Sequence, residues 1–450
     1  MIEASIDRIV EEARARAAER RRSFVWSPDG DLAAPALAPP PAPARPLEVL
    51  LADGERTLFN YVRDPRLNVR MHERGRPLEA APDVVVLTRI DRREPEDSAA
   101  GLPREVWGAL SEGRAALVMD ASGEGSPFWP QSADRLHRFL QAHGARPSMA
   151  AFVTQDRGWP AAYEAYCEKR GLGAERIGIW NHDLYIQRII AESSRRGEGA
   201  FRRRLDAYVA RGPRRRRRFV SLNRTLRPVK TLFLLRLMQL GLFDSGFVSL
   251  GVLGDVGSGK VVSLPQYAEL LTQARGLGGL ADELMPYLDR LAAIGPIDLG
   301  YDVLKAAPLK AYDRSWFTVV TESHVSDRLH RITEKPLKPI LNFHPFVVLG
   351  CVGSLQLLRA YGFDTFPQMF DERYDETTGL RKRFDKVVEE TRRLCLAGDA
   401  TLAELDRQVA PTVVFNAWWG LVELPEVFHS HIEARLIDDL VRLHARGAEA

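Results

Sequence analysis

A set of charged residues follows an apolar run in the second half of the chain. The run covers residues 316–321, a second run begins at His344, and between them lie Glu322, Arg331, Thr333, Glu334, Lys335 and Lys338. This order predicts a buried strand, a loop, a helix that begins near Thr333 and a second buried strand. Open α/β sheets bind ligands at the carboxyl ends of their strands, and a helix N-terminus there favours anions. The pattern therefore predicts a phosphate-binding site.

Two lysines in the first turn of a helix are unfavourable by themselves, because the helix dipole prefers acids there. Lys335 and Lys338 fit this position best if an anion binds between them and the backbone amides. Glu334 could then accept hydrogen bonds from the hydroxyl groups of a sugar. The competing interpretation is a surface helix start with scattered charges.

A second basic cluster lies upstream, where a short apolar run ends and a helix begins. Asn223 follows the run, and Pro228 suits the first turn of a helix. Arg224, Arg227 and Lys230 therefore gather at a strand-to-helix junction, and an arginine can hold two phosphate oxygens at once. This favours a diphosphate ligand, while a solvated basic loop is the alternative.

The composition is that of a globular protein with more than one domain. A length of 450 residues exceeds what one hydrophobic core usually supports, which predicts two or three domains. Hydrophobic residues at 45% and charged residues at 27% are ordinary values, and a net charge of +3 creates no field that would recruit nucleic acid or membranes. Cys167, Cys351 and Cys395 form no paired motif, which favours a reducing compartment and argues against a disulfide scaffold or structural zinc.

The sequence shows no sign of export or of a membrane span. The first residues carry acids and lack the apolar stretch of a secretory signal. The most apolar window, residues 231–243, is interrupted by Arg236 and is too short to cross a bilayer. We therefore expect a cytoplasmic, soluble protein.

Alternating apolar runs and helical patterns predict two α/β domains. Residues 1–45 combine a helical pattern with a Pro/Ala-rich linker, and we expect this helix to be an appendage. A basic stretch that includes residues 214–218 separates a first domain, 46–212, from a second, 213–395, and residues 396–450 are expected to form a helical tail. Four runs of the first domain are predicted to be buried strands of a doubly wound parallel sheet: 47–51, 84–87, 115–119 and 149–153.

The two charged clusters together resemble the donor-binding domain of the α1,3-fucosyltransferases and their bacterial and phage relatives. The resemblance covers residues 215–352 and rests on four segments in the same order: Ser221-Leu-Asn-Arg-Thr-Leu-Arg227, Phe317-Thr-Val-Val-Thr-Glu-Ser323, Arg331-Ile-Thr-Glu-Lys335 and Pro345-Phe-Val-Val-Leu-Gly350. It implies an α/β fold with two Rossmann-like lobes that face each other across a cleft, the architecture called GT-B. It also implies an inverting transfer from a nucleotide sugar that uses neither a metal ion nor another cofactor.

The resemblance also implies roles for individual residues. Arg227 or Arg224 and Lys335 would bind the donor diphosphate, while Glu322 and Glu334 would hold hydroxyl groups of the sugar or the ribose. The full set of candidate donor-binding residues is Asn223, Arg224, Arg227, Glu322, Arg331, Thr333, Glu334, Lys335 and Lys338.

Two departures from the family pattern concern the identity of the donor. The Asn that follows the first Glu in the family is Ser323 here, and the Tyr before Thr-Glu-Lys is Arg331. The sugar and the base therefore stay open, as does the class of acceptor: a glycan, a protein or a small molecule.

An inverting transferase needs a base that removes the proton of the acceptor hydroxyl. In the predicted first lobe, Asp120 and Glu124 follow a strand end, and His182 lies in the segment Trp180-Asn-His-Asp183. These three are the candidate catalytic residues. Capping and turn formation are the alternative roles for each of them.

Two other motifs could suggest different chemistry. Residues 254–260 match the phosphate loop of NTPases, but Val261 replaces the hydroxyl residue that binds magnesium, so a Gly-rich turn is favoured. Asp371, Glu372 and Asp375 are expected to form a solvated acidic loop rather than a metal site.

Two remaining features could form binding surfaces. Residues 214–218 are basic but lack the interleaved aromatic residues of nucleic-acid modules, so we expect a solvated linker, with contact to an acidic membrane as the functional alternative. Trp418 and Trp419 could form an acceptor platform, although core positions are favoured.

The sequence thus predicts a glycosyltransferase that uses a nucleotide sugar. A non-catalytic nucleotide- or sugar-binding protein and an NTPase are the rival hypotheses.

Overall fold

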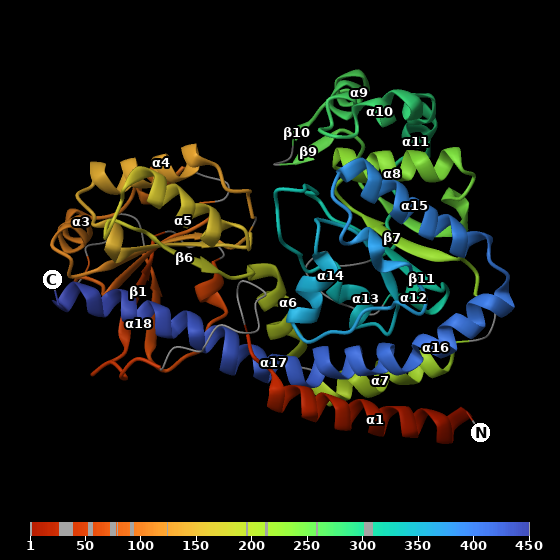
Figure 1. The fold of residues 1–450 in the computed structure, drawn as a ribbon, viewed down its shortest axis with the longest axis horizontal. Helices are drawn as coiled ribbons and strands as arrows, with labels where there is room; N and C mark the ends of the chain where they lie inside the picture. Colours follow the sequence, from red (N-terminus) through yellow and green to blue (C-terminus); the bar gives the residue numbers. More distant parts are fainter. Residues whose placement is uncertain are drawn as a thin grey trace. The chain divides into compact units, whose positions relative to one another are not determined.

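The computed structural model describes residues 2–26, 39–52, 57–72, 78, 80–90, 94–123, 125–194, 197–211, 215–257, 260–300 and 309–449. They form two compact units: unit 1 comprises Met1–Phe24, Ile189–Asp327 and Ile332–Pro425, and unit 2 comprises Val25–Arg188, Arg328–Arg331 and Glu426–Ala450. The predicted α/β fold with parallel sheets, an N-terminal helix and C-terminal helices is confirmed (Figure 1). The placement of the lobes across a cleft stays a prediction.

Unit 1 is built on a four-stranded parallel sheet in the order β12-β11-β7-β8. Its strands are β7 (Phe219–Asn223), β8 (Gly246–Leu250), β11 (Phe317–Thr321) and β12 (Phe346–Leu349). The chain passes from β7 to β8 on one side of β7 and returns to β11 on the other side. The strand order therefore reverses between β7 and β11, which is where open α/β sheets bind ligands.

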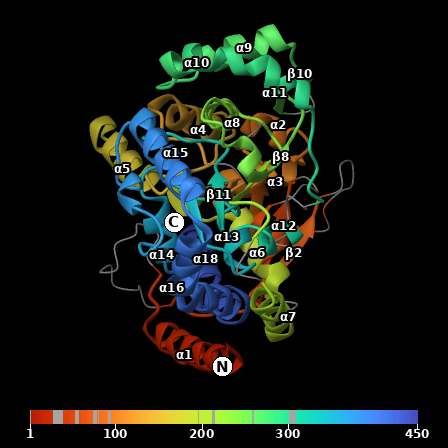
Figure 2. The same cartoon turned by 90° about the vertical axis from the view of Figure 1, so that its right-hand side faces the viewer.

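The helices of unit 1 include a contacting pair and a further group of three helices outside it. The helices α8 (Pro228–Gln239) and α15 (Leu380–Leu396) contact each other through Phe233 and Phe384. Figure 2 shows that α9 (Leu264–Thr272), α10 (Gly278–Leu284) and α11 (Leu288–Ile294) lie together on the outer side of α8.

The N-terminal helix α1 (Ile2–Ser23) is a packed element of unit 1, which corrects the expectation of an appendage. It lies along α16 (Asp399–Trp418). The guanidinium groups of Arg14 and Arg16 lie 4.6 Å and 4.3 Å from the ring centres of Trp418 and Phe415. The arginines of this helix are the reason for predicting a solvated appendage. Some of them contribute to packing instead, because a guanidinium group can stack on an aromatic face.

The basic stretch that is predicted to be a solvated linker is also part of unit 1. Arg215 has 3% of its side chain exposed, pairs with Asp406 at 2.6 Å and lies 4.3 Å from the ring centre of Trp316. Arg214 lies outside the described residues. An arginine can be buried in this way because its planar group uses donors and faces at once.

The C-terminal segment continues from α16 through α17 (Leu424–Val427) to α18 (Ala434–Glu449), with only π-helical turns between them. Trp418 and Trp419 are 6% and 0% exposed, which confirms the core interpretation for both.

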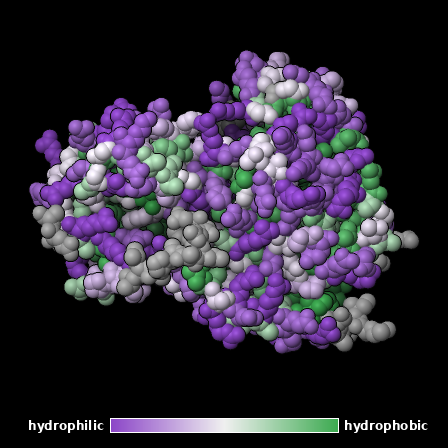
Figure 3. Space-filling model, in the orientation of Figure 1, coloured by the Kyte–Doolittle hydropathy of each residue, from purple (hydrophilic) through white to green (hydrophobic). Residues whose placement is uncertain are grey.

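Figure 3 shows a mostly hydrophilic face on which hydrophobic residues form small, scattered patches. None of the helices in the described ranges is long and apolar enough to cross a membrane.

Unit 2 is built on a six-stranded parallel sheet in the order β2-β1-β3-β4-β5-β6. Its strands are β1 (Leu47–Leu51), β2 (Leu67–Met71), β3 (Val84–Leu87), β4 (Ala116–Ala121), β5 (Ala150–Thr154) and β6 (Gly178–Asn181). The four predicted strands are confirmed as β1, β3, β4 and β5, because their apolar runs are buried on both faces. The edge strands β2 and β6 carry polar or partly exposed residues, so no continuous apolar run predicts them.

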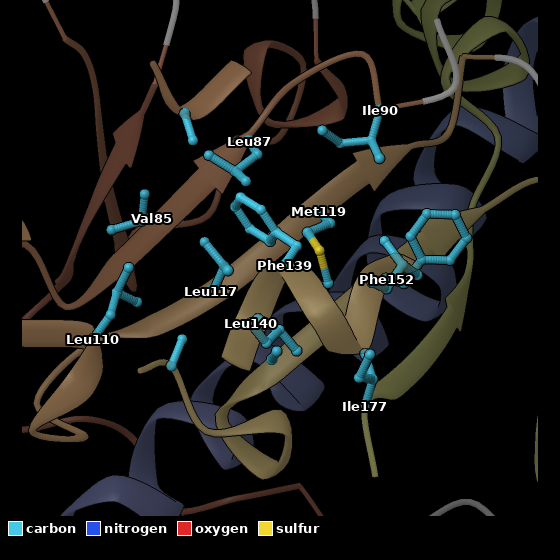
Figure 4. Close-up of a cluster of buried hydrophobic side chains, with 14 of the residues drawn as sticks. Val85, Leu87, Ile90, Leu110, Leu117, Met119, Phe139, Leu140, Phe152 and Ile177 are labelled. Carbon is cyan, nitrogen blue, oxygen red and sulfur yellow. The ribbon is translucent and has the colours of Figure 1, made fainter. Parts of the chain in front are cut away.

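Helices cover both faces of the sheet in unit 2. One face packs against α2 (Pro95–Ala99), α3 (Arg104–Ser111), α4 (Pro130–Ala142) and α5 (Trp159–Arg170). In Figure 4, Phe139 of α4 lies over Leu117 and Met119 of β4. The other face packs against α18, which contributes Leu436 and Ile437.

The units differ from the predicted domains in where the chain passes between them. The change near the middle of the chain lies at Arg188 and Ile189, inside α6 (Leu184–Ser194), and not near residue 212. The predicted tail 396–450 is divided, since α16 belongs to unit 1 and α18 to unit 2. Both changes fall inside helical segments without linker composition, so the sequence contains no boundary signal there.

Candidate functional site

The candidate site lies at the carboxyl ends of β7 and β11, where the strand order of unit 1 reverses. Asn223 ends β7 and is fully buried. Its side-chain oxygen accepts a hydrogen bond of 2.7 Å from Thr321, its side-chain nitrogen donates to Ser221 at 3.0 Å, and its backbone amide donates to Ser249 at 2.7 Å. Asn223 thus joins the ends of β7, β8 and β11, which gives it a structural role in the site.

Four predicted donor-binding residues are brought together directly after β11. Glu322 is 2% exposed and accepts hydrogen bonds from the hydroxyl group of Thr333 at 2.8 Å and from its amide at 3.1 Å. The Nζ atom of Lys335 lies 3.3 Å from Glu322, 3.5 Å from Glu334 and 3.0 Å from the hydroxyl oxygen of Thr333. The ammonium group of Lys335 is therefore held in place before any ligand binds.

The predicted helix start at Thr333 is wrong. The helix α13 (Leu337–Ile340) is a single turn, and Thr333, Glu334 and Lys335 lie in the loop before it. Lys335 precedes Pro336, and a residue before proline avoids helical dihedral angles, so the helix begins only later. A helix of one turn has little dipole, so an anion here would be attracted by side-chain charge.

Two buried lysines complete this group of charges. Lys230 is 2% exposed in the first turn of α8, and Lys338 is 6% exposed in α13. Burial lowers the pKa of Lys230 to about 7, and Lys335 acts in the same direction, while Glu322 and Glu334 oppose the shift and Lys338 adds to it. Lysine is almost never fully buried without a specific reason, which makes Lys230 a candidate functional residue.

The motif resemblance does not assign Lys230 to the donor, although the sequence contains a signal for its burial. Residues 231–238 are apolar on almost every side of the helix, which is typical of a buried helix. Burial of such a helix also buries a lysine in its first turn.

The two predicted phosphate-binding arginines lie on the loop from β7 to α8. Arg224 is exposed, and Arg227 is half-buried at the N-cap of α8. Pro228 begins α8, which confirms the predicted helix start. A Cβ atom at Gly251 would lie 1.5 Å from the carbonyl oxygen of Arg224, so glycine is required for this close approach of the backbone.

Arg331 belongs to unit 2, whereas the other predicted donor-binding residues belong to unit 1. It is 4% exposed and donates a hydrogen bond of 2.9 Å to the side-chain oxygen of Gln155. The neighbouring amide of His330 donates to Asp156 at 2.9 Å. Two residues after the end of β5 therefore bind the segment of His330 and Arg331. This contact joins residues that are far apart in the chain, so the sequence around Arg331 does not predict it.

The carboxylate of Asp120, the first candidate base, is buried and hydrogen-bonded within unit 2. It is 3% exposed, and its carboxylate accepts hydrogen bonds from the amides of Ser122 at 2.9 Å and Leu58 at 3.1 Å, as well as from the hydroxyl group of Thr57. Both carboxylate oxygens are thus used to hold the ends of neighbouring segments in unit 2.

His182 is sealed in unit 2, and Glu124 lies outside the described residues. The His182 side chain is 2% exposed, and burial lowers its pKa to about 3, with Arg157 acting in the same direction. Neither ring nitrogen has a hydrogen-bond partner in the part of the chain that the structure describes. His182 is therefore neutral and closed to solvent, unlike a base that must meet an acceptor.

Residues 254–260 do not form the phosphate loop of an NTPase. The strands β9 (Asp255–Gly257) and β10 (Lys260–Val261) pair in an antiparallel hairpin, and Lys260 is exposed on β10. A phosphate loop connects a strand to a helix. The antiparallel pairing of β9 and β10 therefore contradicts the NTPase hypothesis, and residues 258 and 259 lie outside the described residues.

The acidic residues after α14 (Ser354–Ala360) are not a uniformly solvated loop. Asp371 is exposed and pairs with Arg373, whereas Asp375 is 4% exposed and accepts a hydrogen bond of 3.0 Å from the amide of Leu355. Burial raises the pKa of Asp375 to about 6. Across the described ranges, His, Cys, Asp and Glu form no group that could hold a metal ion.

Comparisons with known proteins give one structural likeness. No protein-family model matches the chain, and no curated protein matches it in sequence. A solved structure described as the crystal structure of an α1,3-fucosyltransferase is similar with a TM-score of 0.36 and 9% sequence identity, over 88% of this chain and 98% of that chain. A likeness at this level establishes neither membership of that family nor an activity.

Proposed function

We propose that the protein is a glycosyltransferase that takes a sugar from a nucleotide sugar, and that unit 1 binds the donor. The observation that carries the proposal is the gathering of Glu322, Lys335 and the buried Lys230 where the strand order reverses. Lysine and arginine match the oxygens of a diphosphate, and carboxylates match the hydroxyl groups of a sugar or ribose. The motif resemblance to the α1,3-fucosyltransferases over residues 215–352 supports the same class of donor.

Stabilisation of the leaving diphosphate is the main catalytic contribution in this proposal. As the bond to the sugar breaks, negative charge develops on the diphosphate, and Lys335 together with Arg227 would neutralise it without a metal ion. Contacts with Glu322, Glu334 and Thr333 fix the Lys335 ammonium group in advance. Such preorganised charges lower the barrier because they need no rearrangement during the reaction.

The acceptor hydroxyl would attack from the opposite side of the sugar and invert the anomeric centre, while a base removes its proton. The side chains of Asp120 and His182 are both buried and closed to solvent, so neither can reach an acceptor hydroxyl. Glu124 is therefore the candidate base that we retain. Glu124→Gln is expected to lower transfer by roughly 100-fold, since general bases contribute about that much or more, while donor binding stays within about 2-fold. Unchanged transfer would remove Glu124 from the mechanism.

A non-catalytic binding protein with the same fold is the second candidate function. It is favoured by the closed environments of Asp120 and His182, which leave unit 2 without an accessible base among its described candidates. Such a protein would bind nucleoside diphosphates but would not cleave nucleotide sugars.

One experiment separates these functions. Thermal unfolding is measured with a panel of nucleoside diphosphates and nucleotide sugars, because a ligand that binds only the native state raises the melting temperature. Hydrolysis of each stabilising nucleotide sugar is then measured with and without EDTA. Cleavage that survives EDTA is the expected result, binding without cleavage supports the second candidate, and no response to any compound contradicts both.

A further inference from the structure

We propose that Lys230 is a direct ligand of the donor diphosphate, and that its side-chain amine takes up a proton from the solvent when the diphosphate binds. The inference rests on the proposed function and adds a residue that the motif resemblance does not assign. It also predicts a property of binding, proton uptake, that can be measured independently of turnover.

Lys230 differs from its neighbour Lys335 in the hydrogen bonds that it makes within the described part of the chain. Its side chain is 2% exposed, and among the described residues its ammonium group makes no hydrogen bond or ion pair. Lys335, by contrast, is engaged by Glu322, Glu334 and Thr333. Burying a lysine side chain that makes no hydrogen bond destabilises the free protein, so its presence at the sheet edge is explained best by a ligand that completes its interactions.

The charged groups that act on Lys230 lie in the loop after β11 and in α13. They are Glu322, Glu334 and Lys335 in that loop and Lys338 in α13. Because the two glutamates oppose the two lysines, burial decides the outcome and lowers the pKa of Lys230 to about 7. Near neutral pH this lysine therefore gives up its proton readily.

A diphosphate would change this balance in one direction. It adds two or more negative charges beside Lys230 and no positive charge, so the protonated lysine becomes favoured. The first turn of α8, a helix of 12 residues, offers two further donors, because the amides of Val229 and Lys230 have no acceptor within the helix. In the binding step the Lys230 amine accepts a proton from the solvent, and no bond of the ligand forms or breaks.

This coupling predicts how affinity depends on pH. Above about pH 8 the free lysine is largely neutral, while the terminal phosphate of a nucleoside diphosphate has already lost its last proton near pH 6 to 7. Binding must then draw about one proton from the solvent, and affinity falls by up to tenfold for each further pH unit. Without Lys230 this decrease would be absent or small.

The test is titration calorimetry with ADP, GDP, UDP and CDP at about pH 8, in two buffers whose heats of ionisation differ, so that the difference in binding heat counts protons. For the tightest ligand we expect an uptake of roughly half to one proton by the natural protein. Lys230→Arg is always charged, so it should bind within a few-fold of the natural protein but take up no proton. Lys230→Met should bind at least roughly 10-fold more weakly. Lys260→Met, on the exposed hairpin, is the matched control and should retain the proton uptake.

The outcomes distinguish this inference from the proposed function. If a nucleoside diphosphate binds but the natural protein takes up no proton, or Lys230→Arg takes up as much as the natural protein, the role of Lys230 is overturned and the donor site stands. If none of the four binds, the proposed function fails and this inference fails with it. If Lys230→Met does not fold, the natural protein and Lys230→Arg still decide the question.

Discussion

Thr321 donates a hydrogen bond of 2.7 Å to the side-chain oxygen of Asn223, although the two residues lie 98 positions apart in the chain. Both are buried at the point where β11 and β7 end side by side. One loop continues from Asn223 to Arg227, and the other continues from Thr321 to Glu322. The bond therefore holds the starts of the two loops that carry the candidate site at one edge of the sheet.

Loss of this bond should cost stability. Thr321→Val keeps the shape of the side chain but leaves the buried oxygen of Asn223 without its donor, which costs about 1–3 kcal/mol. The free energy of unfolding from denaturant titration measures the effect. Thr272→Val, at an exposed position of α9, is the control and should change it by no more than about 0.5 kcal/mol. Equal effects at the two positions would show that the Asn223 contact contributes nothing.

Replacement of Lys335 should impair turnover more than replacement of Lys338. The ammonium group of Lys335 is held after the end of β11 by Glu322, Glu334 and Thr333. The motif resemblance assigns Lys335 to the diphosphate and gives no such role to Lys338, which lies in α13. We expect Lys335→Ala to lower nucleotide-sugar cleavage by roughly 100-fold, the size of effect seen for a single charge-stabilising group. Lys338→Ala should lower it much less, and Lys260→Ala should leave it unchanged. Similar rates for Lys335→Ala and Lys338→Ala would refute the assignment of Lys335.

The pH dependence of stability should reveal the cost of burying Lys230. Its pKa is about 7 in the folded protein and 10.5 in the unfolded chain, so folding releases a proton between these values and the free energy of unfolding rises with pH. Lys230→Met removes this penalty and should stabilise the ligand-free protein. The gain should be about 2.7 kcal/mol larger at pH 6 than at pH 9. Denaturant titration at the two pH values measures it, with Lys260→Met as the control. A gain that is independent of pH would mean that Lys230 keeps its proton in the folded state.

His182 should make unit 2 sensitive to acid. Its pKa is about 3 in the folded protein and 6.5 in the unfolded chain, so below about pH 6.5 the unfolded chain binds a proton that the folded state refuses. Between pH 7 and pH 5 this difference removes about 2 kcal/mol of stability. His182→Gln, which is neutral at every pH, should lose that much less over the same range. The exposed His431→Gln is the comparison, and an equal pH dependence in both variants would contradict the sealed environment of His182.

The sequence predicts those parts of the fold that local pattern determines. The apolar runs of β3, β4 and β5 are buried throughout in a parallel sheet, so each run appears without interruption in the chain. Pro228 likewise predicts the start of α8, because its ring suits the first helical position. In the candidate site, the proximity of Glu322 and Lys335 follows from the same local order.

Other features depend on contacts between distant residues, which no local pattern contains. Arg331 is two residues from Thr333 in the chain, yet it is bound by Gln155 in unit 2. Arg215 belongs to a basic run for which the sequence predicts a solvated linker, but it is buried against Trp316, Asp406 and the carbonyl oxygen of Ser315. The false helix start at Thr333 has a local cause, since the effect of Pro336 on Lys335 outweighs the capping signal.

The division of each unit among separate stretches of chain limits how the protein can be taken apart or rearranged. A cut at Arg188 would leave the sheet of unit 2 without α18, and would expose the apolar face that Leu436 and Ile437 cover. A gene that acquired a new unit 1 by one crossover would lose part of unit 2 in the same event. Under the proposed function, exchange of donor specificity between related proteins is therefore expected to proceed by substitutions within the loops after β7 and β11, and not by replacement of a whole unit.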